Sequence, residues 1–148
     1  MSNRSTKESL FTIGKLAKSS QVKVPTIRYY ESEGLISAVT RTSGNQRLYS
    51  NKELNRLNFI RHGRELGFTL DDVRDLVSLQ QGLDEPCADA HRIVNEQLIS
   101  VRSRIERLKS LETELARIAD LHDPGACKNC KVIESLGDHS LCTNDHVE

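Results

Sequence analysis

Apolar residues recur at helical spacing along most of the chain, and short polar turns separate the periodic segments. Residues 11–14 read as an extended lead-in. Thr12 is then expected to cap a helix that runs to Ser19, with an inner face made of Ile13, Leu16 and Ala17. After a polar turn over residues 20–24, a second short helix begins at Pro25, where a missing N–H is harmless. Two short helices with a tight turn between them predict a helix-turn-helix.

The outward side chains of the second helix favour contact with nucleic acid. Ile27 and Tyr30 are three residues apart and can share a buried face. A hydroxyl, a guanidinium and a phenol then group outside, on Thr26, Arg28 and Tyr29. A helix N-terminus favours phosphate, and in helix-turn-helix proteins the first residues of this helix also read base edges. An ordinary surface helix would show the same local pattern, so the neighbouring segments decide between the two interpretations.

A two-stranded wing is predicted directly after the second helix. Gly34 suits the position that follows a helix end. An apolar run at Leu35 and Ile36, a turn at residues 42–45 and a return segment that ends at Tyr49 complete the pattern.

Two further helices are predicted after the wing. Ser50 is expected to cap the first, with Glu53 placed for a capping box. Its apolar positions are Leu54, Leu57, Phe59 and Ile60. Thr69 is expected to cap the second helix, which Gly82 closes. Its apolar positions are Leu70, Val73, Leu76, Val77 and Leu79.

A long uninterrupted helix is predicted from about residue 86 to residue 121, before a stop signal at residues 123–125. Its apolar positions alternate spacings of four and three residues, with one extra three between Leu108 and Leu111, as in a coiled coil. Such a helix is roughly 54 Å long. A domain of this size cannot bury it alone, so a second copy of the chain is the expected partner. Packing on its own domain is the alternative. The apolar stripe comprises Val94, Leu98, Val101, Ile105, Leu108, Leu111, Leu115 and Ile118.

The charge is divided unevenly along the chain, although its formal net value is zero. Residues 1–80 hold 13 Lys and Arg against 8 Asp and Glu, whereas residues 81–148 hold 8 against 13. A basic half can bind nucleic acid while an acidic half stays away from it. With 36% hydrophobic residues and no Trp, the chain is also lean for a large compact core.

No stretch approaches the roughly 18 consecutive apolar residues of a membrane span. The polar first eight residues show no secretory signal. We therefore expect a cytoplasmic protein with no membrane partner. In a reducing compartment the four cysteines are expected to be thiols or metal ligands rather than structural disulfides.

At this point the chain resembles the MerR family of bacterial transcription regulators, and within it the soft-metal sensors. The similarity runs from Phe11 to about Leu136. Its strongest segments, in order, are residues 13–17, 26–31, 34–35, 44–49, 59–61 and 66–68. The chain has no room for the larger ligand domain of the drug-sensing members, and it ends in a Cys-bearing loop.

The resemblance implies a mainly α fold in four parts. A disordered N-terminus (1–10) precedes a winged helix-turn-helix domain (11–82), an antiparallel coiled-coil dimerisation helix (83–121), and a metal-binding loop, short helix and tail (122–148). It also implies a homodimer on palindromic, double-stranded promoter DNA. With a metal inducer bound, such a dimer distorts the promoter so that RNA polymerase engages both of its elements and metal-resistance or efflux genes are activated. That distortion has a free-energy cost of order 1–10 kcal/mol.

The family's binding surfaces correspond to particular residues here. The resemblance implies DNA contacts from Lys15, Thr26, Arg28, Tyr29, Arg41, Asn45, Arg47 and Tyr49. The dimer interface is expected to include Val94, Leu98, Val101, Ile105, Leu108 and Leu115.

The expected metal ligands lie at the two ends of the long helix. Cys87 stands at its start, and Cys127 and Cys130 follow its end. In an antiparallel dimer, Cys87 of one protomer meets Cys127 and Cys130 of the other, where the resemblance also places the metal. Thiolates select Zn, Cd, Pb, Hg or Cu(I). A Cys at the position of Cys87 resembles the divalent-metal sensors, since the copper and silver sensors have Ser there.

One departure from the family and three alternatives remain. Asp123 stands where these sensors usually carry a Cys, and Cys127 is expected to substitute for it. Weaker candidate ligands are His122, His139 and Cys142. Two other kinds of regulator are alternatives to a divalent-metal sensor. One is a redox sensor that acts by thiol oxidation or an Fe–S cluster, and the other is a Cu(I) sensor. An enzyme is not expected, because the sequence shows no recognisable set of catalytic residues.

Overall fold

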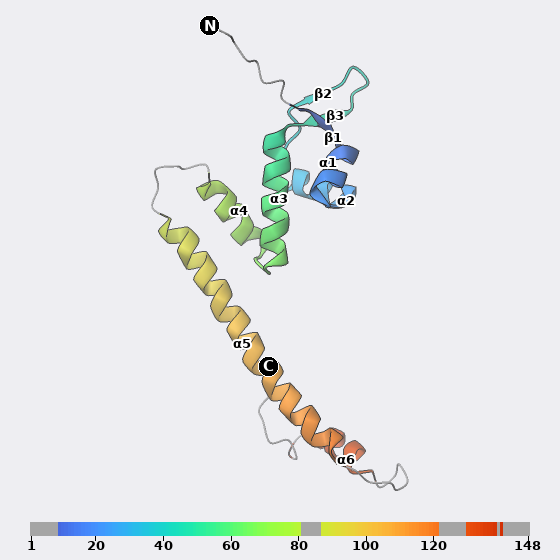
Figure 1. Cartoon of the computed structure of the whole chain (residues 1–148), viewed down its shortest axis with the longest axis vertical. Coiled ribbons are helices and arrows are strands. Elements are labelled where there is room, and N and C mark those ends of the chain that lie inside the picture. Colours follow the sequence, from blue (N-terminus) through green and yellow to red (C-terminus); the bar gives the residue numbers. More distant parts are fainter. Residues whose placement is uncertain (1–8, 81–86, 122–129, 139, 141–148) are drawn as a thin grey trace. The chain divides into compact units, whose positions relative to one another are not determined.

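The computed structural model describes residues 9–80, 87–121, 130–138 and 140. The chain is mainly helical, and it divides into two compact units between Ile93 and Val94. Figure 1 shows the first unit as a cluster of short elements, and the second contains most of the long helix. The N-terminal segment expected to be disordered lies almost wholly outside the described residues. None of the helices in the described ranges is both long and apolar enough to cross a membrane.

The predicted helix-turn-helix is confirmed. Helix α1 (Ile13–Ser20) begins after Thr12, whose hydroxyl oxygen accepts the N–H of Lys15 at 3.4 Å. Helix α2 (Val24–Ser32) starts one residue earlier than expected, with Pro25 inside its first turn. Between the helices, the buried Ser20 hydroxyl donates to the Leu16 carbonyl at 2.8 Å and accepts from the Val22 N–H at 3.4 Å. These two bonds use the polar groups of the turn, so the helices can pack closely.

The wing has one more strand than the sequence predicts. Strands β2 (Thr40–Arg41) and β3 (Arg47–Tyr49) form the expected hairpin, and the lead-in becomes β1 (Phe11–Thr12). The sheet order is β1-β3-β2, and both pairings are antiparallel. Strand β3 therefore has a neighbour on each side, whereas a lone hairpin would leave one of its edges unpaired. The wing is thereby joined to the start of the helix-turn-helix.

Two more helices of the first unit are α3 (Asn51–Glu65) and α4 (Leu70–Leu79). The cap at Thr69 is confirmed, because its hydroxyl oxygen accepts the N–H of Asp72 at 3.1 Å. The capping box expected at Ser50 is wrong: the Ser50 side chain makes no cap hydrogen bond. The buried Glu53 carboxylate instead accepts the backbone N–H of Ser37 at 3.2 Å. Because Glu53 is buried, its carboxylate needs a hydrogen-bond partner, and the Ser37 N–H provides one away from the helix end.

The core lies where α1, α2, α3 and α4 meet the sheet. Its fully buried side chains include Leu16, Ile27, Ile36, Tyr49, Leu57, Ile60 and Val73. Helices α3 and α4 approach closely at Gly63, where a Cβ atom would lie 3.1 Å from Val73 Cγ2. This packing determines which face of α2 remains at the surface.

The long helix is confirmed as α5 (Ala88–Ala119), and a short helix, α6 (Lys131–Gly137), lies near the C-terminus. Six of the apolar residues in the predicted stripe of α5 are exposed within the single chain. They are Val94, Leu98, Val101, Ile105, Leu108 and Leu115, with exposed fractions from 36% to 64%. These residues give the helix an apolar face that nothing in the described part of the single chain covers. Exposure of such a row to water is unfavourable, so a partner is expected to cover it.

Candidate nucleic-acid interface and metal centre

Burial of one face of α2 determines what its other face presents. Ile27 and Tyr30 are buried in the core, so Arg28 and Tyr29 are turned to the surface, and Tyr29 is 51% exposed. Thr26 is half-buried in the first turn of the same helix. The ring centroids of Tyr29 and Tyr30 lie 5.9 Å apart in a tilted arrangement. The core therefore supports the exposed phenol and guanidinium on the outer face of the helix.

The tip of the wing holds a second group of the predicted DNA contacts. Arg41 and Asn45 are both exposed, and the Arg41 Nη1 group donates to Asn45 Oδ1 at 2.9 Å across the hairpin. Asn45 adopts a left-handed backbone with φ of 63°, and its N–H donates to the Thr42 carbonyl at 2.9 Å. Asparagine tolerates this conformation better than most residues. The tight turn thus presents a guanidinium and an amide together.

Glu31 connects the recognition helix α2 to the wing. Its Oε1 atom lies 3.3 Å from Arg47 Nε and accepts the Tyr49 hydroxyl at 3.2 Å. Tyr49 is fully buried, so its expected DNA contact is corrected: the side chain belongs to the core, and its hydroxyl is used within the protein. Burial, followed by the charge and hydrogen bond of Glu31, raises the pKa of Tyr49, against smaller opposing effects of Arg47 and Arg28.

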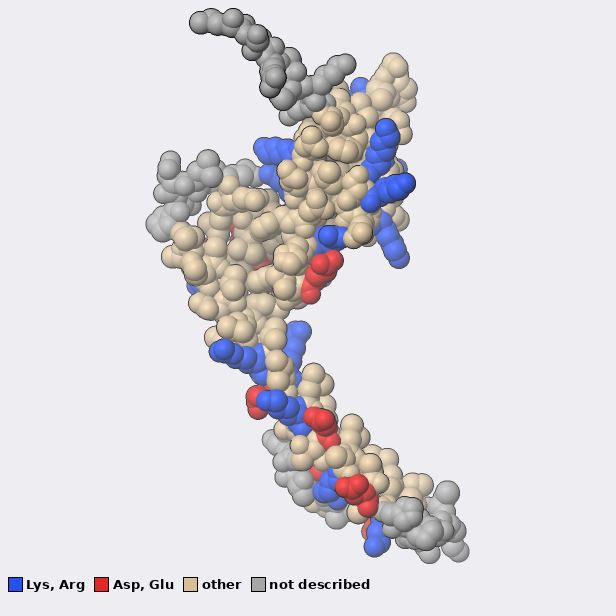
Figure 2. Space-filling model, viewed as in Figure 1, with Lys and Arg blue, Asp and Glu red and all other residues tan. Residues whose placement is uncertain are grey.

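The surface of the helix-turn-helix and wing is positive. Residues 11–50 contain six Lys and Arg and two acidic residues. Both acids are paired within the fold, Glu31 with Arg47 and Glu33 with Arg74 Nη2 of α4 at 3.0 Å. Figure 2 shows blue side chains gathered over this part of the first unit, with little red beside them. A phosphate backbone would meet a cationic surface here.

Sequence reasoning missed a basic groove beside the first turn of α2. It has a volume of about 380 Å³, and the charged residues that line it in the described part of the chain are Lys23, Arg61, Arg64 and Glu65, so three cations outnumber one acid. The Arg61 Nη1 group donates to Gln21 Oε1 at 2.6 Å, which ties α3 to the turn of the helix-turn-helix. The signal in the sequence is the pair of arginines three residues apart, which share one face of a helix.

The exposed Lys15 lies on α1, in the same unit as these surfaces. The positive residues of the expected DNA interface therefore come from three elements: α1, the outer face of α2 and the wing. These elements are connected through the β1–β3 pairing and through Glu31. Their arrangement is typical of a winged helix-turn-helix that contacts DNA through both the helix and the wing.

The structure describes two of the predicted metal ligands. Cys87 is exposed immediately before α5, and Cys130 is half-buried at the N-cap of α6; both are free thiols. Cys127, His122, His139 and Cys142 lie outside the described residues. Within the described part of one chain, no three His, Cys, Asp or Glu side chains are close enough to hold a metal ion. Thiols suit soft and borderline ions, so the chemistry of the two described donors fits the expected metal.

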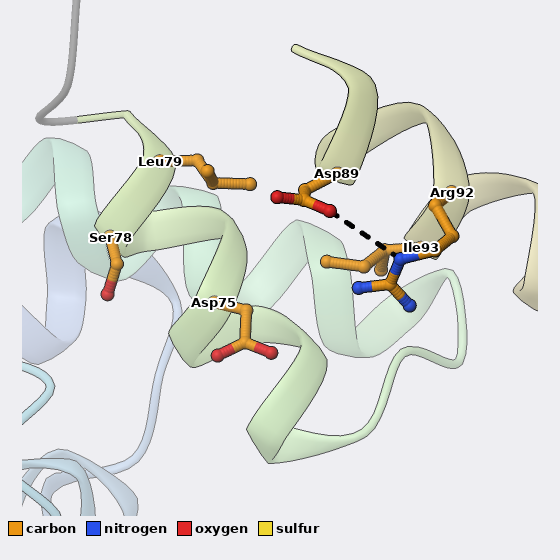
Figure 3. Close-up of a pocket in the computed structure, with 6 residues that line it drawn as sticks. All are labelled: Asp75, Ser78, Leu79, Asp89, Arg92 and Ile93. Atoms are coloured by element: carbon orange, nitrogen blue, oxygen red, sulfur yellow. Dashed lines mark ion pairs between the residues drawn. The ribbon is translucent and has the colours of Figure 1, made fainter. Parts of the chain in front are cut away.

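A cleft of about 310 Å³ lies between α4 and the first turns of α5, within the first unit (Figure 3). It is lined by Asp75, Ser78, Leu79, Asp89, Arg92 and Ile93. The Arg92 Nε atom lies 3.6 Å from Asp89 Oδ1, and the aliphatic ends of Leu79 and Ile93 point into the cleft. Neither Cys87 nor Cys130, the two predicted ligands that the structure describes, is among the described residues that line this cleft.

These features define a class: a winged helix-turn-helix DNA-binding protein with a long helix that exposes an apolar stripe. Two family models match the chain, one described as MerR HTH family regulatory protein over residues 11–80 and one as MerR, DNA binding over residues 54–118. The chain is 38% identical over 130 residues to the HTH-type transcriptional regulator ZntR of Escherichia coli (strain K12), a match that covers 86% of this chain and 92% of that protein.

Two further relatives agree with this match. The mercuric resistance operon regulatory protein of Bacillus cereus is 34% identical, over 85% of this chain and 96% of its own length. A solved structure also matches, the crystal structure of the transcription regulator PbrR691 from Ralstonia metallidurans CH34 in complex with lead(II). Its sequence is 36% identical to this chain, the TM-score is 0.75, and the match covers 85% of this chain and 98% of that chain. The chain belongs to the MerR family of transcription regulators. The matches support its interpretation as a metal-responsive regulator, and the family consists of regulators rather than enzymes.

Proposed function

We propose that this protein is a homodimer that binds a palindromic promoter and activates transcription when a divalent soft metal ion, Zn, Cd, Pb or Hg, binds between its two chains. The observation that carries the proposal is the placement of the free thiol of Cys87 at the start of the helix whose apolar stripe is exposed. The same element would then join two chains and begin at a metal ligand. The names of the relatives, which include a mercury regulator and a lead-bound regulator, support the class of inducer.

The dimer follows from the exposed stripe of α5. Burial of a Val, Leu or Ile side chain contributes about 1.5–3 kcal/mol, and the stripe holds six such exposed residues in each chain. Alternating spacings of four and three residues allow a second helix to interlock with them. Antiparallel pairing would bring the start of each α5 to the end of its partner.

The metal site would then be shared. Cys87 of one protomer and Cys127 with Cys130 of the other supply three thiolates for one ion. Such a bridge ties the end of one long helix to the start of the next, so it can shift one DNA-binding unit relative to the other. Only a difference in metal affinity between the two dimer states can drive that shift. This difference in metal affinity would supply the free energy for distorting the promoter, so that RNA polymerase can engage both promoter elements.

Promoter output in a cell-free transcription system tests this function across Zn, Cd, Pb, Hg, Cu(I) and Co. Wild type should activate with at least one divalent soft ion. Cys87→Ser, Cys127→Ser and Cys130→Ser should each keep operator affinity and lose activation, while Cys142→Ser should lose less. Activation by oxidant without metal would instead support a redox sensor.

A mixed dimer tests whether the site is shared. One chain carries Cys87→Ser, and the other carries Cys127→Ser with Cys130→Ser. If the ligands come from both chains, one site loses all three thiols and the other keeps all three, so the dimer binds half the metal of wild type at near-native affinity. If each chain supplied its own set, both sites would be damaged and no tight site would remain.

A further inference from the structure

The first turn of α5 presents a second potential metal ligand, His91. Cys87 immediately precedes this helix, and its carbonyl oxygen accepts the His91 N–H at 3.0 Å, so the two residues are one helical turn apart. Residues at this spacing are neighbours on one face, with Cβ atoms about 5–6 Å apart. A thiolate and an imidazole so placed can bind one ion together, as the paired histidines of helical zinc sites do.

Both side chains are accessible. Cys87 and His91 are exposed, and within the described part of the chain neither side chain has a hydrogen-bond or ion-pair partner. A histidine with a structural role would be expected to use a ring nitrogen in a hydrogen bond. The imidazole of His91 therefore has both nitrogens available for another ligand.

The opposite face of the same turn is already occupied. Figure 3 shows Asp89, Arg92 and Ile93 turned toward α4, where they line the cleft. Ile93 is only 3% exposed and belongs to the core of the first unit. At 3.6 residues per turn, Cys87 and His91 project from roughly the other side of the helix.

That other side is the face of the apolar stripe. Cys87 and His91 precede Val94, Leu98 and Val101 at spacings of four, three, four and three residues. This is the alternation that keeps positions on one face of a coiled-coil helix. A partner that covers the stripe therefore also approaches the Cys87 thiol and the His91 imidazole. In the proposed dimer, this partner is the far end of the other protomer's long helix.

We infer that His91 is a nitrogen ligand of the metal centre, an inference that rests on the proposed function. His91 would add one nitrogen to the thiolates of the proposed shared site, beside Cys87 of the same protomer. Four-coordinate zinc sites that combine thiolate and imidazole ligands are common. Imidazole suits Zn, whereas thiolates alone suit the softer ions, so His91 biases the site toward Zn²⁺ among the candidate inducers.

The test uses the full-length dimer, with Co²⁺ as a spectroscopic probe and Zn²⁺ in competition titrations. His91→Gln should lower Zn²⁺ affinity by at least about tenfold, which is the smallest loss usual when a supporting residue of a metal site is removed. It should also change the ligand-field bands of bound Co²⁺, while operator affinity without metal stays the same. His62→Gln is the matched control, because His62 is an exposed histidine of α3 outside the proposed site. It should change neither measurement.

Two more measurements separate a ligand from a neighbour. In ¹⁵N-histidine NMR spectra of the zinc-loaded protein, one ring nitrogen of His91 should shift, and the signals of His62 should not. His91→Cys should restore tight binding with a preference moved from Zn²⁺ toward Cd²⁺, since the site would hold thiolates alone.

The outcomes distinguish the two proposals. Wild-type protein that binds none of Zn²⁺, Cd²⁺, Pb²⁺ and Hg²⁺ would overturn the proposed function and this inference with it. Wild-type protein that binds Cd²⁺, Pb²⁺ or Hg²⁺ but neither Zn²⁺ nor Co²⁺ would overturn this inference alone. Wild-type protein that binds both ions, with His91→Gln giving the same affinity and the same Co²⁺ bands, would overturn the ligand role of His91 alone. A weaker affinity with unchanged bands and no shifted ring nitrogen would also overturn it, because His91 would then act from outside the coordination sphere.

Discussion

The Tyr49 hydroxyl of the wing donates to Glu31 Oε1 of the recognition helix at 3.2 Å, and the same carboxylate oxygen lies 3.3 Å from Arg47 Nε. One acidic side chain thus holds both a buried phenol and a guanidinium of the DNA-facing surface. Glu31 is only 18% exposed in its side chain, so these interactions are partly shielded from water. They link the wing directly to α2.

Removal of the Glu31 charge should reduce specificity more than affinity. Glu31→Gln keeps an oxygen that can accept from Tyr49 but releases Arg47, so the wing arginine is no longer held in one position. Loss of an acidic group also favours phosphate binding in general. We expect the ratio of operator affinity to random-DNA affinity to fall, as measured by fluorescence anisotropy at a fixed salt concentration. An unchanged ratio would show that Arg47 is not positioned by Glu31.

The protein should lose stability at alkaline pH through Tyr49. Burial and Glu31 raise the pKa of Tyr49 above the usual tyrosine value of about 10. The folded protein therefore keeps this proton when the unfolded chain has lost it. The stabilisation is complete below about pH 10 and disappears as the pH rises through the pKa of the folded state.

Urea unfolding at a series of pH values up to about 11 would measure this loss. Tyr49→Phe removes the titrating group and should flatten the decline, while it lowers stability at neutral pH by about 1 kcal/mol for the missing hydrogen bond. Parallel declines in both proteins would exclude Tyr49 as the source.

Arginines on the proposed DNA surface should contribute to the salt dependence of binding. Arg28→Ala and Arg41→Ala should each weaken binding and lower the slope of log affinity against log salt by about one if the side chain contacts a phosphate. Arg104→Ala is the matched control, since this exposed arginine lies in the second unit. Equal slopes for wild type and both surface variants would place the DNA elsewhere.

Dimerisation should depend on the apolar stripe of α5. Ile105→Glu would place an unpaired charge within an apolar interface, which is strongly unfavourable. Sedimentation velocity should then show monomer or aggregate in place of dimer. Ile99→Glu is the control, because Ile99 is 66% exposed and lies off the stripe, so the dimer should persist. A wild-type monomer at micromolar concentration would remove both the dimer and the shared metal site.

Features that depend on neighbouring residues were predictable from the sequence. The caps at Thr12 and Thr69 involve residues three positions apart, and the burial of Ile27 and Tyr30 follows from helical spacing. The unbroken periodicity of α5 likewise predicted a helix with one apolar face. In each case, hydrogen bonds and periodicity within one element are sufficient.

Features that depend on residues distant in sequence required the tertiary structure. Tyr49 resembled a surface contact, but the packing of β3 on the core buries it against Glu31, 18 positions away. Glu53 suited a local cap, but the N–H of Ser37, 16 positions away, takes its carboxylate. The sequence by itself therefore determined the helices, the caps at Thr12 and Thr69 and the apolar faces of the helices. Only tertiary packing decided which of the polar side chains remain at the surface, because a buried donor or charge takes its partner wherever folding places one.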